Sequence, residues 1–190
     1  TTLFRSKHSG VEAETIAHRL MGNWSPTPEF YRQLLHPDAQ DADISKPYPF
    51  FLASPIEGEP AALGDVREWQ AEWKWDGIRA QLLRRSGDPH LWSRGDELLT
   101  ERFPELHADS RRLPVGTVLD GEIVAWRDGR VLPFTRLQQR ITRKAIGRKL
   151  LAEVPCVFIA FDLLEFEGVD LRGEPLHYRR RMLERLFAET

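Results

Sequence analysis

The stretch EWKWDGIRAQ, residues 72–81, places a lysine between two carboxylates. If the stretch is a strand, alternation sends Glu72, Lys74 and Asp76 to one face. A lysine in that setting is either an ordinary surface ion pair or, once it has lost its proton, a nucleophile. The opposite face would hold three indoles, which we expect to be buried against helices: Trp69, Trp73 and Trp75.

A second pair of carboxylates lies in VLDGEIVAW, residues 118–126. Strand alternation puts Asp120 and Glu122 on one face. Two carboxylates so close repel each other unless a cation, a donor-rich ligand or water lies between them. The alternative is the ordinary solvated face of an antiparallel strand.

Two further side chains suit contacts with a ligand. Arg94 follows Ser93 and precedes Gly95 where a strand ends, and a guanidinium matches phosphate oxygens bidentately. An ordinary turn explains it equally well. Phe161 lies in the apolar run 154–168, where the pattern alone favours a core residue over a ligand platform.

Bulk composition excludes several classes of protein. The 190 residues carry a net charge of −2, so the chain as a whole is not a polycation. The single cysteine, Cys156, excludes an internal disulfide and a cysteine-rich zinc site and is typical of a reducing cytoplasm, where we expect the protein. No apolar run is long enough to span a bilayer, so we expect no membrane partner.

Positive charge is concentrated locally. Residues 127–149 contain eight basic residues and one acid, Asp128. Such a stretch is either a solvated helix surface or a surface for nucleic-acid phosphates.

Periodicity and turn residues predict an α+β fold with mainly antiparallel sheets and packed helices. Expected strands cover 69–76, 78–84, 89–93, 117–126 and 154–164, and expected helices cover 11–21, 28–35, 101–112, 134–152 and 177–188. Asp128-Gly129 indicates a hairpin. The proline-rich stretch 36–60 suggests a connector, so we expect a helical appendage and linker over 1–47, the end of an upstream DNA-binding domain, and a compact domain over 48–190.

Four motifs in order resemble ATP-dependent DNA ligases of the bacterial type. KWDGIR, from Lys74 to Arg79, matches the K-x-D-G-x-R signature of covalent nucleotidyltransferases. It is followed by SRGDELLTERFPEL, LDGEIVAW and FIAFDLLEFEGVDLRGEPL, and the resemblance covers roughly residues 48–187. It implies an ATP-grasp-like nucleotidyltransferase fold, that of the ligase adenylation domain.

The resemblance also implies a role for each matched residue. Lys74 corresponds to the lysine that attacks the α-phosphate of ATP and becomes lysyl-AMP. Glu72 would contact the adenine edge, Arg79 and Glu122 the ribose, and Phe161 the adenine ring. Arg94 would meet the 5′-phosphate of a nick. The supporting residues would be Asp76, Gly77 and Asp120.

The family's later lysine motifs, E-G-x-x-x-K and K-x-K, have no match here, since FEGVDLR at 166–172 ends without the lysine. The resemblance therefore implies an incomplete adenylation domain, without metal ligands of its own, from an enzyme that uses ATP with Mg²⁺ or Mn²⁺. Its partners would be nicked double-stranded DNA and the OB-fold and DNA-binding domains of the same polypeptide, in reactions of DNA replication, recombination or repair. Two alternatives stay open: an RNA ligase or capping-type nucleotidyltransferase, and a non-catalytic nucleic-acid-binding remnant of the fold.

Overall fold

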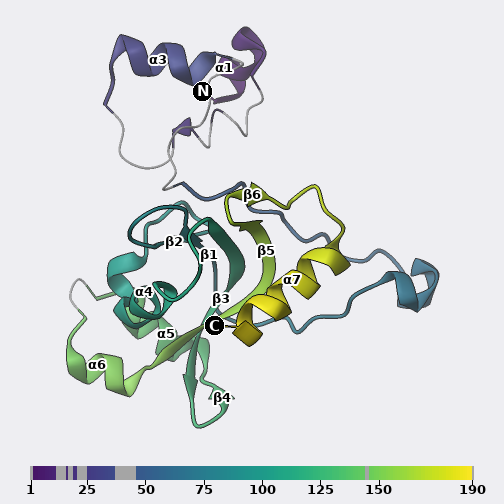
Figure 1. Ribbon diagram of the computed structural model, residues 1–190, viewed down its shortest axis with the longest axis vertical. Coiled ribbons are helices and arrows are strands. Elements are labelled where there is room, and N and C mark those ends of the chain that lie inside the picture. Colours follow the sequence, from purple (N-terminus) through teal and green to yellow (C-terminus); the bar gives the residue numbers. More distant parts are fainter. Residues whose placement is uncertain are drawn as a thin grey trace.

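An antiparallel sheet with strand order β2-β1-β3-β5-β6 forms the centre of the computed structural model, and β4 pairs with the end of β3 (Figure 1). The structure describes residues 2–11, 16, 19, 20, 25–36, 46–143 and 146–189. The strands are β1 Ile78–Arg84, β2 His90–Ser93, β3 Thr117–Arg127, β4 Arg130–Val131, β5 Cys156–Phe166 and β6 Val169–Asp170.

Helices cover one face of this sheet. They are α4 Pro104–Ser110, α5 Phe134–Ile141, α6 Arg148–Glu153 and α7 Leu176–Glu189, and a 3₁₀ turn, η3 Thr100–Arg102, precedes α4. The main core forms where Leu106 of α4, Leu137 of α5 and Leu183 of α7 meet Leu119 and Leu163 of the sheet. Apolar burial of this kind is the main stabilising contribution to folding. The expected α+β fold with antiparallel pairing is confirmed.

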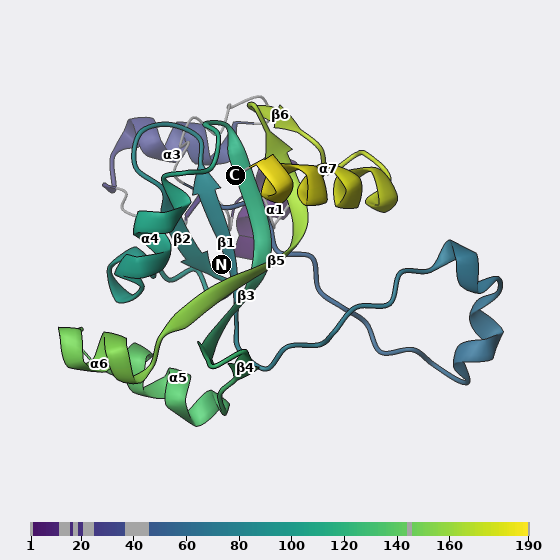
Figure 2. The same cartoon turned by 60° about the horizontal axis from the view of Figure 1, so that its bottom comes forward.

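The strand expected over residues 69–76 is wrong. The first strand begins only at Ile78, and residues 50–77 run out from the sheet as an extended arm with two short 3₁₀ helices, η1 Pro60–Leu63 and η2 Val66–Glu68 (Figure 2). Trp69 and Trp73 are 55% and 83% exposed, so the expected burial of the indoles is wrong for these two. Alternation alone does not make a strand, since the backbone also needs a neighbouring strand to bond, and none of the described strands pairs with this segment.

Two expected helices are interrupted. The helix expected over 101–112 is divided into η3 and α4, because Pro104 cannot sit inside a helix and instead begins α4. The helix expected over 134–152 is divided into α5 and α6, with Gly147 in extended conformation before α6. Glycine is a poor helix former, so a break there costs little.

The hairpin expected at Asp128-Gly129 is confirmed. Both residues have positive φ, 51° and 76°, which matches a two-residue turn between β3 and β4. Glu167 and Gly168 form a similar turn between β5 and β6, with φ of 50° and 79°. The stretch 166–172 is thus a hairpin.

The N-terminal residues form a small helical unit apart from the sheet (Figure 1). It contains α1 Thr2–Ser9 and α3 Pro28–Leu35, and its core is Val11, Ile16 and Leu34. Thr27 caps α3 by accepting the Phe30 N–H, as its position before Pro28 predicts. The helix expected over 11–21 lies mostly outside the described residues, and the domain division at residue 47 stays a prediction. Among the helices described, none is long and apolar enough to cross a membrane.

Tyr48 anchors the start of the arm to the sheet face that the helices leave uncovered. The hydroxyl of Tyr48 donates to Glu165 at 2.8 Å. The Gln81 side chain accepts from the backbone N–H of Tyr48 at 2.8 Å and donates to the carbonyl of Tyr48 at 3.0 Å. The guanidinium groups of Arg85 and Arg172 lie over its ring at 4.6 and 3.8 Å. Burial and the Glu165 carboxylate raise the pKa of Tyr48 to about 12, so the phenol remains a donor at neutral pH.

Replacing Tyr48 with phenylalanine should lower the free energy of unfolding by about 1.5 kcal/mol, because the buried Glu165 loses a charge-assisted hydrogen bond. Urea denaturation measures the change. The matched control is Tyr31→Phe, at a tyrosine that is 53% exposed on α3 and whose change should stay within roughly 0.5 kcal/mol. Equal losses in the two variants would refute the anchor.

Candidate active site

The candidate site lies on the same uncovered face of the sheet. In the β1–β3 register Arg79 is opposite Glu122, and Gln81 is opposite Asp120. Alternation therefore puts all four side chains on one face, away from Leu82 and Leu119, which enter the helix-covered core. The shared face that the sequence predicted for Asp120 and Glu122 is present.

Arg79 and Asp120 form a bidentate ion pair on this face. The Nε of Arg79 donates to Oδ1 of Asp120 at 2.8 Å, and its Nη2 donates to Oδ2 at 2.9 Å. Burial raises the pKa of Asp120, and the Arg79 guanidinium opposes that shift. The same guanidinium lies 4.8 Å from the centroid of the Phe161 ring, so Arg79 joins the central carboxylate to the aromatic of β5.

Glu122 is the second carboxylate of the face and is half-buried. Burial raises its pKa above the ordinary value, while the guanidinium of Arg79, the backbone amide of Gly77 and the charges of Arg94 and Lys74 act in the opposite direction. Lys74 and Arg94 are thus close enough to Glu122 to influence its charge. The three cations Arg79, Arg94 and Lys74 favour the ionised form of Glu122, which is suited to accept hydrogen bonds from a ligand.

The turn before β1 passes very close to β3. A Cβ added to Gly77 would lie 2.2 Å from the Ile123 carbonyl oxygen and 2.9 Å from Cγ of Glu122. Gly121 is similarly confined, since its Cβ would lie 2.5 Å from the Ile159 carbonyl oxygen. These two glycines let the backbone of neighbouring segments approach closely, which any larger residue prevents.

Gly77→Ala should therefore displace the turn and lower the free energy of unfolding by roughly 1–3 kcal/mol, the cost typical of overpacking. Chemical denaturation measures it. Gly173→Ala is the matched control, because an added Cβ there has no neighbour within 4 Å. The close approach would be disproved if both variants unfolded at the same denaturant concentration.

Lys74 and Glu72 lie on the arm just before β1, and both side chains are exposed. Glu72 accepts a hydrogen bond from Gln70, and Trp73 and Trp75 contact each other with ring centroids 6.5 Å apart. Lys74 therefore approaches the face from a loop and not from a strand. Both residues belong to the arm, but Lys74 is near enough to Glu122 for their charges to interact, whereas Glu72 contacts Gln70 within the arm.

Arg94 enters the same end of the sheet from β2. Its backbone N–H donates to the Arg79 carbonyl at 2.9 Å, and its side chain is exposed. The turn that follows closes where Ser93 Oγ accepts the Glu97 N–H, with Asp96 at a φ of 63°. Asp76 is exposed in the bend before β1.

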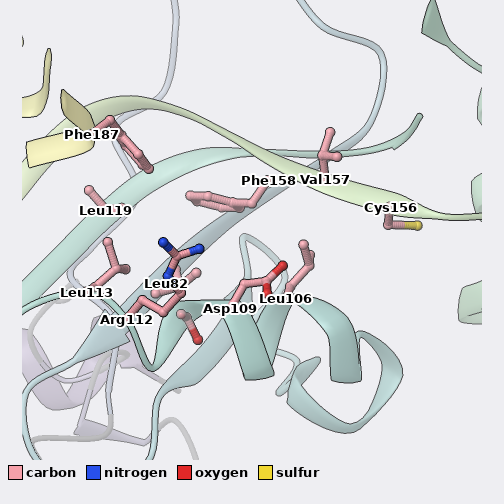
Figure 3. A pocket seen from close by; sticks show the side chains of 11 residues that line it. Leu82, Leu106, Asp109, Arg112, Leu113, Leu119, Cys156, Val157, Phe158 and Phe187 are labelled. Carbon is pink, nitrogen blue, oxygen red and sulfur yellow. The ribbon is translucent and has the colours of Figure 1, made fainter. Parts of the chain in front are cut away.

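The described residues contain no group of three histidine, cysteine or acidic side chains arranged to hold a metal ion. An open cavity of about 360 Å³ exists, but Leu82, Leu119 and Phe158 line it, so it lies on the helix-covered side of the sheet (Figure 3). It is not the space in front of Arg79 and Glu122.

Sequence patterns missed the contacts that order this face. The Arg79–Asp120 pair follows from the register of β1 and β3, which alternation within one strand does not supply. Arg179 of α7 binds Asp162 of β5 at 2.8 and 3.0 Å, which ties the helix to that strand. For the Arg79–Asp120 pair, the sequence offered only an arginine in one expected strand and an aspartate in another.

Comparison with known proteins assigns the family. The model described as "ATP dependent DNA ligase domain" matches residues 50–190. A probable DNA ligase of Opitutus terrae is 46% identical over 66% of this chain and 12% of its own length, and one of Koribacter versatilis is 37% identical over 75% and 25%.

Solved structures agree. The ligase domain of LigD from M. tuberculosis matches with a TM-score of 0.52 and 33% identity over 63% of this chain and 37% of that chain. A mycobacterial DNA ligase D complexed with ATP and MES matches with a TM-score of 0.51 and 34% identity over 62% and 36%. These likenesses confirm the nucleotidyltransferase-type fold, and this chain spans only a minor part of each relative. With a family model that covers most of its length, the chain belongs to the ATP-dependent DNA ligase domain family.

Proposed function

We propose that this chain contributes the nucleotide-binding part of a DNA ligase that transfers AMP from ATP to Lys74 and then to the 5′-phosphate of a nick. The observation that carries the proposal is the joining of Arg79, Asp120 and Phe161 on one face beside Glu122, with the Lys74 loop arriving at the same place. The ATP complex of the structural relative supports the choice of nucleotide.

Each side chain has a role that fits its surroundings. Glu122 would accept from ribose hydroxyls, because it is half-buried and faces donors. Arg79, fixed by Asp120, would hold the sugar, and Phe161 would stack on the base. The guanidinium of Arg79 lies over the same ring, 4.8 Å from its centroid, and so orders the aromatic that the base would contact. Glu72 would reach the base edge when the arm folds over the ligand.

The chemistry is a displacement at phosphorus. The lone pair of the neutral Lys74 amine forms a P–N bond with the α-phosphorus, the α–β anhydride P–O bond breaks, and pyrophosphate leaves with the electron pair while the amine proton goes to solvent. A 5′-phosphate oxygen then bonds to the phosphorus of AMP while the P–N bond breaks and the lysine amine takes up a proton. The 3′-hydroxyl oxygen finally attacks the 5′-phosphorus, the anhydride bond to AMP breaks, AMP leaves with the electron pair, and the hydroxyl proton goes to solvent. Positioning and charge neutralisation do most of the work in such transfers.

Arg94 is suited to the 5′-phosphate, since its exposed guanidinium is at the same end of the sheet as Arg79. A divalent cation, Mg²⁺ or Mn²⁺, would be bound mainly through nucleotide phosphates, because the described residues form no carboxylate cage. The sealing steps would also need the OB-fold and DNA-binding domains that the resemblance implies. We further infer a cytoplasmic location from the single buried thiol, Cys156.

The test uses the full polypeptide that the gene encodes, incubated with ATP and Mg²⁺ and measured by intact-protein mass spectrometry. We expect a mass gain of one AMP and then sealing of a nicked DNA duplex. Adduct formation with GTP in preference to ATP, or sealing of nicked RNA in preference to DNA, would overturn the DNA ligase assignment. The absence of any adduct would favour a non-catalytic remnant.

A further inference from the structure

Exposed cations gather at one end of the sheet, on the β3–β4 hairpin, α5 and α6. We call this surface the basic end. Its members are Arg130, Arg136, Arg143, Arg148 and Lys149, all exposed or half-buried. Figures 1 and 2 both show the hairpin and the two helices grouped together at this end.

The charges of the basic end are largely uncompensated. Within the described residues, the guanidinium groups of Arg130, Arg136, Arg143 and Arg148 make no ion pair or hydrogen bond, and Lys149 only approaches Glu153 at 3.8 Å. By contrast, Arg180 and Arg185 on α7 each pair with a glutamate four residues on, at 2.8 Å.

The excess of positive charge is local. From 127 to 153 the described side chains that reach solvent comprise six cations, the five of the basic end and Arg127, against two carboxylates, Asp128 and Glu153. That is an excess of four positive charges on a chain whose net charge is −2. A patch of this kind attracts a polyanion although the whole molecule does not.

The backbone that carries these cations is fixed. The guanidinium of Arg127 donates to the carbonyls of Ala152 and Glu153, which ties the hairpin to the end of α6. Arg102 donates to the carbonyls of Ile141 and Arg143, which holds the segment after α5 against η3. Cations on an ordered backbone lose less freedom on binding than cations on a loose loop.

The basic end is also next to the candidate active site. Ile78, where β1 begins, pairs with Ile123, and β3 enters the hairpin three residues later at Trp126. The Lys74 loop and Arg79 are therefore at the hairpin end of the sheet. A duplex held by the basic end would lie beside the lysine that carries AMP.

We propose that the basic end binds the phosphate backbone of double-stranded DNA and holds the duplex next to the site of AMP transfer. This inference rests on the proposed function. The contacts are of the kind that give affinity without reading sequence, so binding should be insensitive to base composition and sensitive to salt.

The test is fluorescence anisotropy of a labelled nicked duplex with a 5′-phosphate, titrated with this chain at several salt concentrations. The variant Arg143→Gln with Arg148→Gln should raise Kd roughly tenfold near 0.1 M salt and reduce the slope of log K against log salt by about 2. Its thermal unfolding should not change, because neither guanidinium has a partner in the described part of the chain.

The matched control is Arg180→Gln with Arg185→Gln, which removes the same charge from α7 and should leave Kd and the salt slope unchanged. Transfer of AMP from ATP to the protein needs no DNA, so it should be normal in both double variants. If the parent protein itself formed no AMP adduct, that result would count against the proposed function and not against the basic end. Equal loss of DNA binding in the two double variants, an unchanged salt slope, or tighter binding of duplex RNA than of DNA would overturn the basic end as a DNA surface.

Discussion

Replacing Lys74 with alanine should abolish the AMP adduct, lowering the rate of adduct formation by at least about 10³-fold, because the variant has no amine to form the P–N bond. Lys74→Arg should be equally inactive, since a guanidinium keeps its charge and does not release a proton at neutral pH. Intact-protein mass spectrometry after incubation with ATP and Mg²⁺ reads the result directly.

Nucleotide binding separates this chemical role from a structural one. Lys74 is exposed on the arm, so its truncation should leave the midpoint of thermal unfolding unchanged and ATP affinity within a few-fold. Lys7→Ala, at an exposed lysine of α1, is the control and should form the adduct normally. An adduct on Lys74→Ala would show that another residue is the nucleophile.

Elements with strong local patterns were predictable. β3 was expected over 117–126 and spans Thr117–Arg127, and α7 was expected over 177–188 and spans Leu176–Glu189. In β3 the alternating Leu119 and Ile123 enter the main core, in α7 Leu183 and Leu186 do so, and local preference agrees with tertiary packing.

The arm shows where local pattern is insufficient. Residues 69–76 alternate as a strand does, yet Trp73 remains 83% exposed because no described strand lies beside it. Pairing is a property of two segments, and a single segment cannot specify it. For the same reason the sequence did not predict the Arg79–Asp120 ion pair, whose members are 41 residues apart.

Arg140 is the clearest case in which a charge pattern was misleading. The sequence counted it among the eight basic residues of a possible phosphate surface, but its side chain is 0% exposed. Its Nη1 and Nη2 donate to the two carboxylate oxygens of Glu105 at 2.8 and 2.9 Å. They also donate to the carbonyls of Val154 and Arg102, and the guanidinium lies 5.1 Å from the Phe103 ring centroid.

Arg140→Met should consequently lower the free energy of unfolding by about 3–5 kcal/mol, because the change leaves the half-buried Glu105 carboxylate and the carbonyls of Val154 and Arg102 without their donors. Urea denaturation monitored by tryptophan fluorescence measures the loss. Arg180→Met on α7 is the control and should cost less than about 1 kcal/mol, since it removes an exposed helical pair.

Adding Glu105→Gln to Arg140→Met tests whether the orphaned charge is the cause. If it is, the double variant should be more stable than the sum of the two single losses predicts, because the glutamine side chain carries no charge that needs a partner. Strict additivity would instead assign the loss to the bonds with the Val154 and Arg102 carbonyls and to packing on Phe103. A loss no larger than that of Arg180→Met would contradict the view that Arg140 connects α5 to η3, α4 and the end of α6.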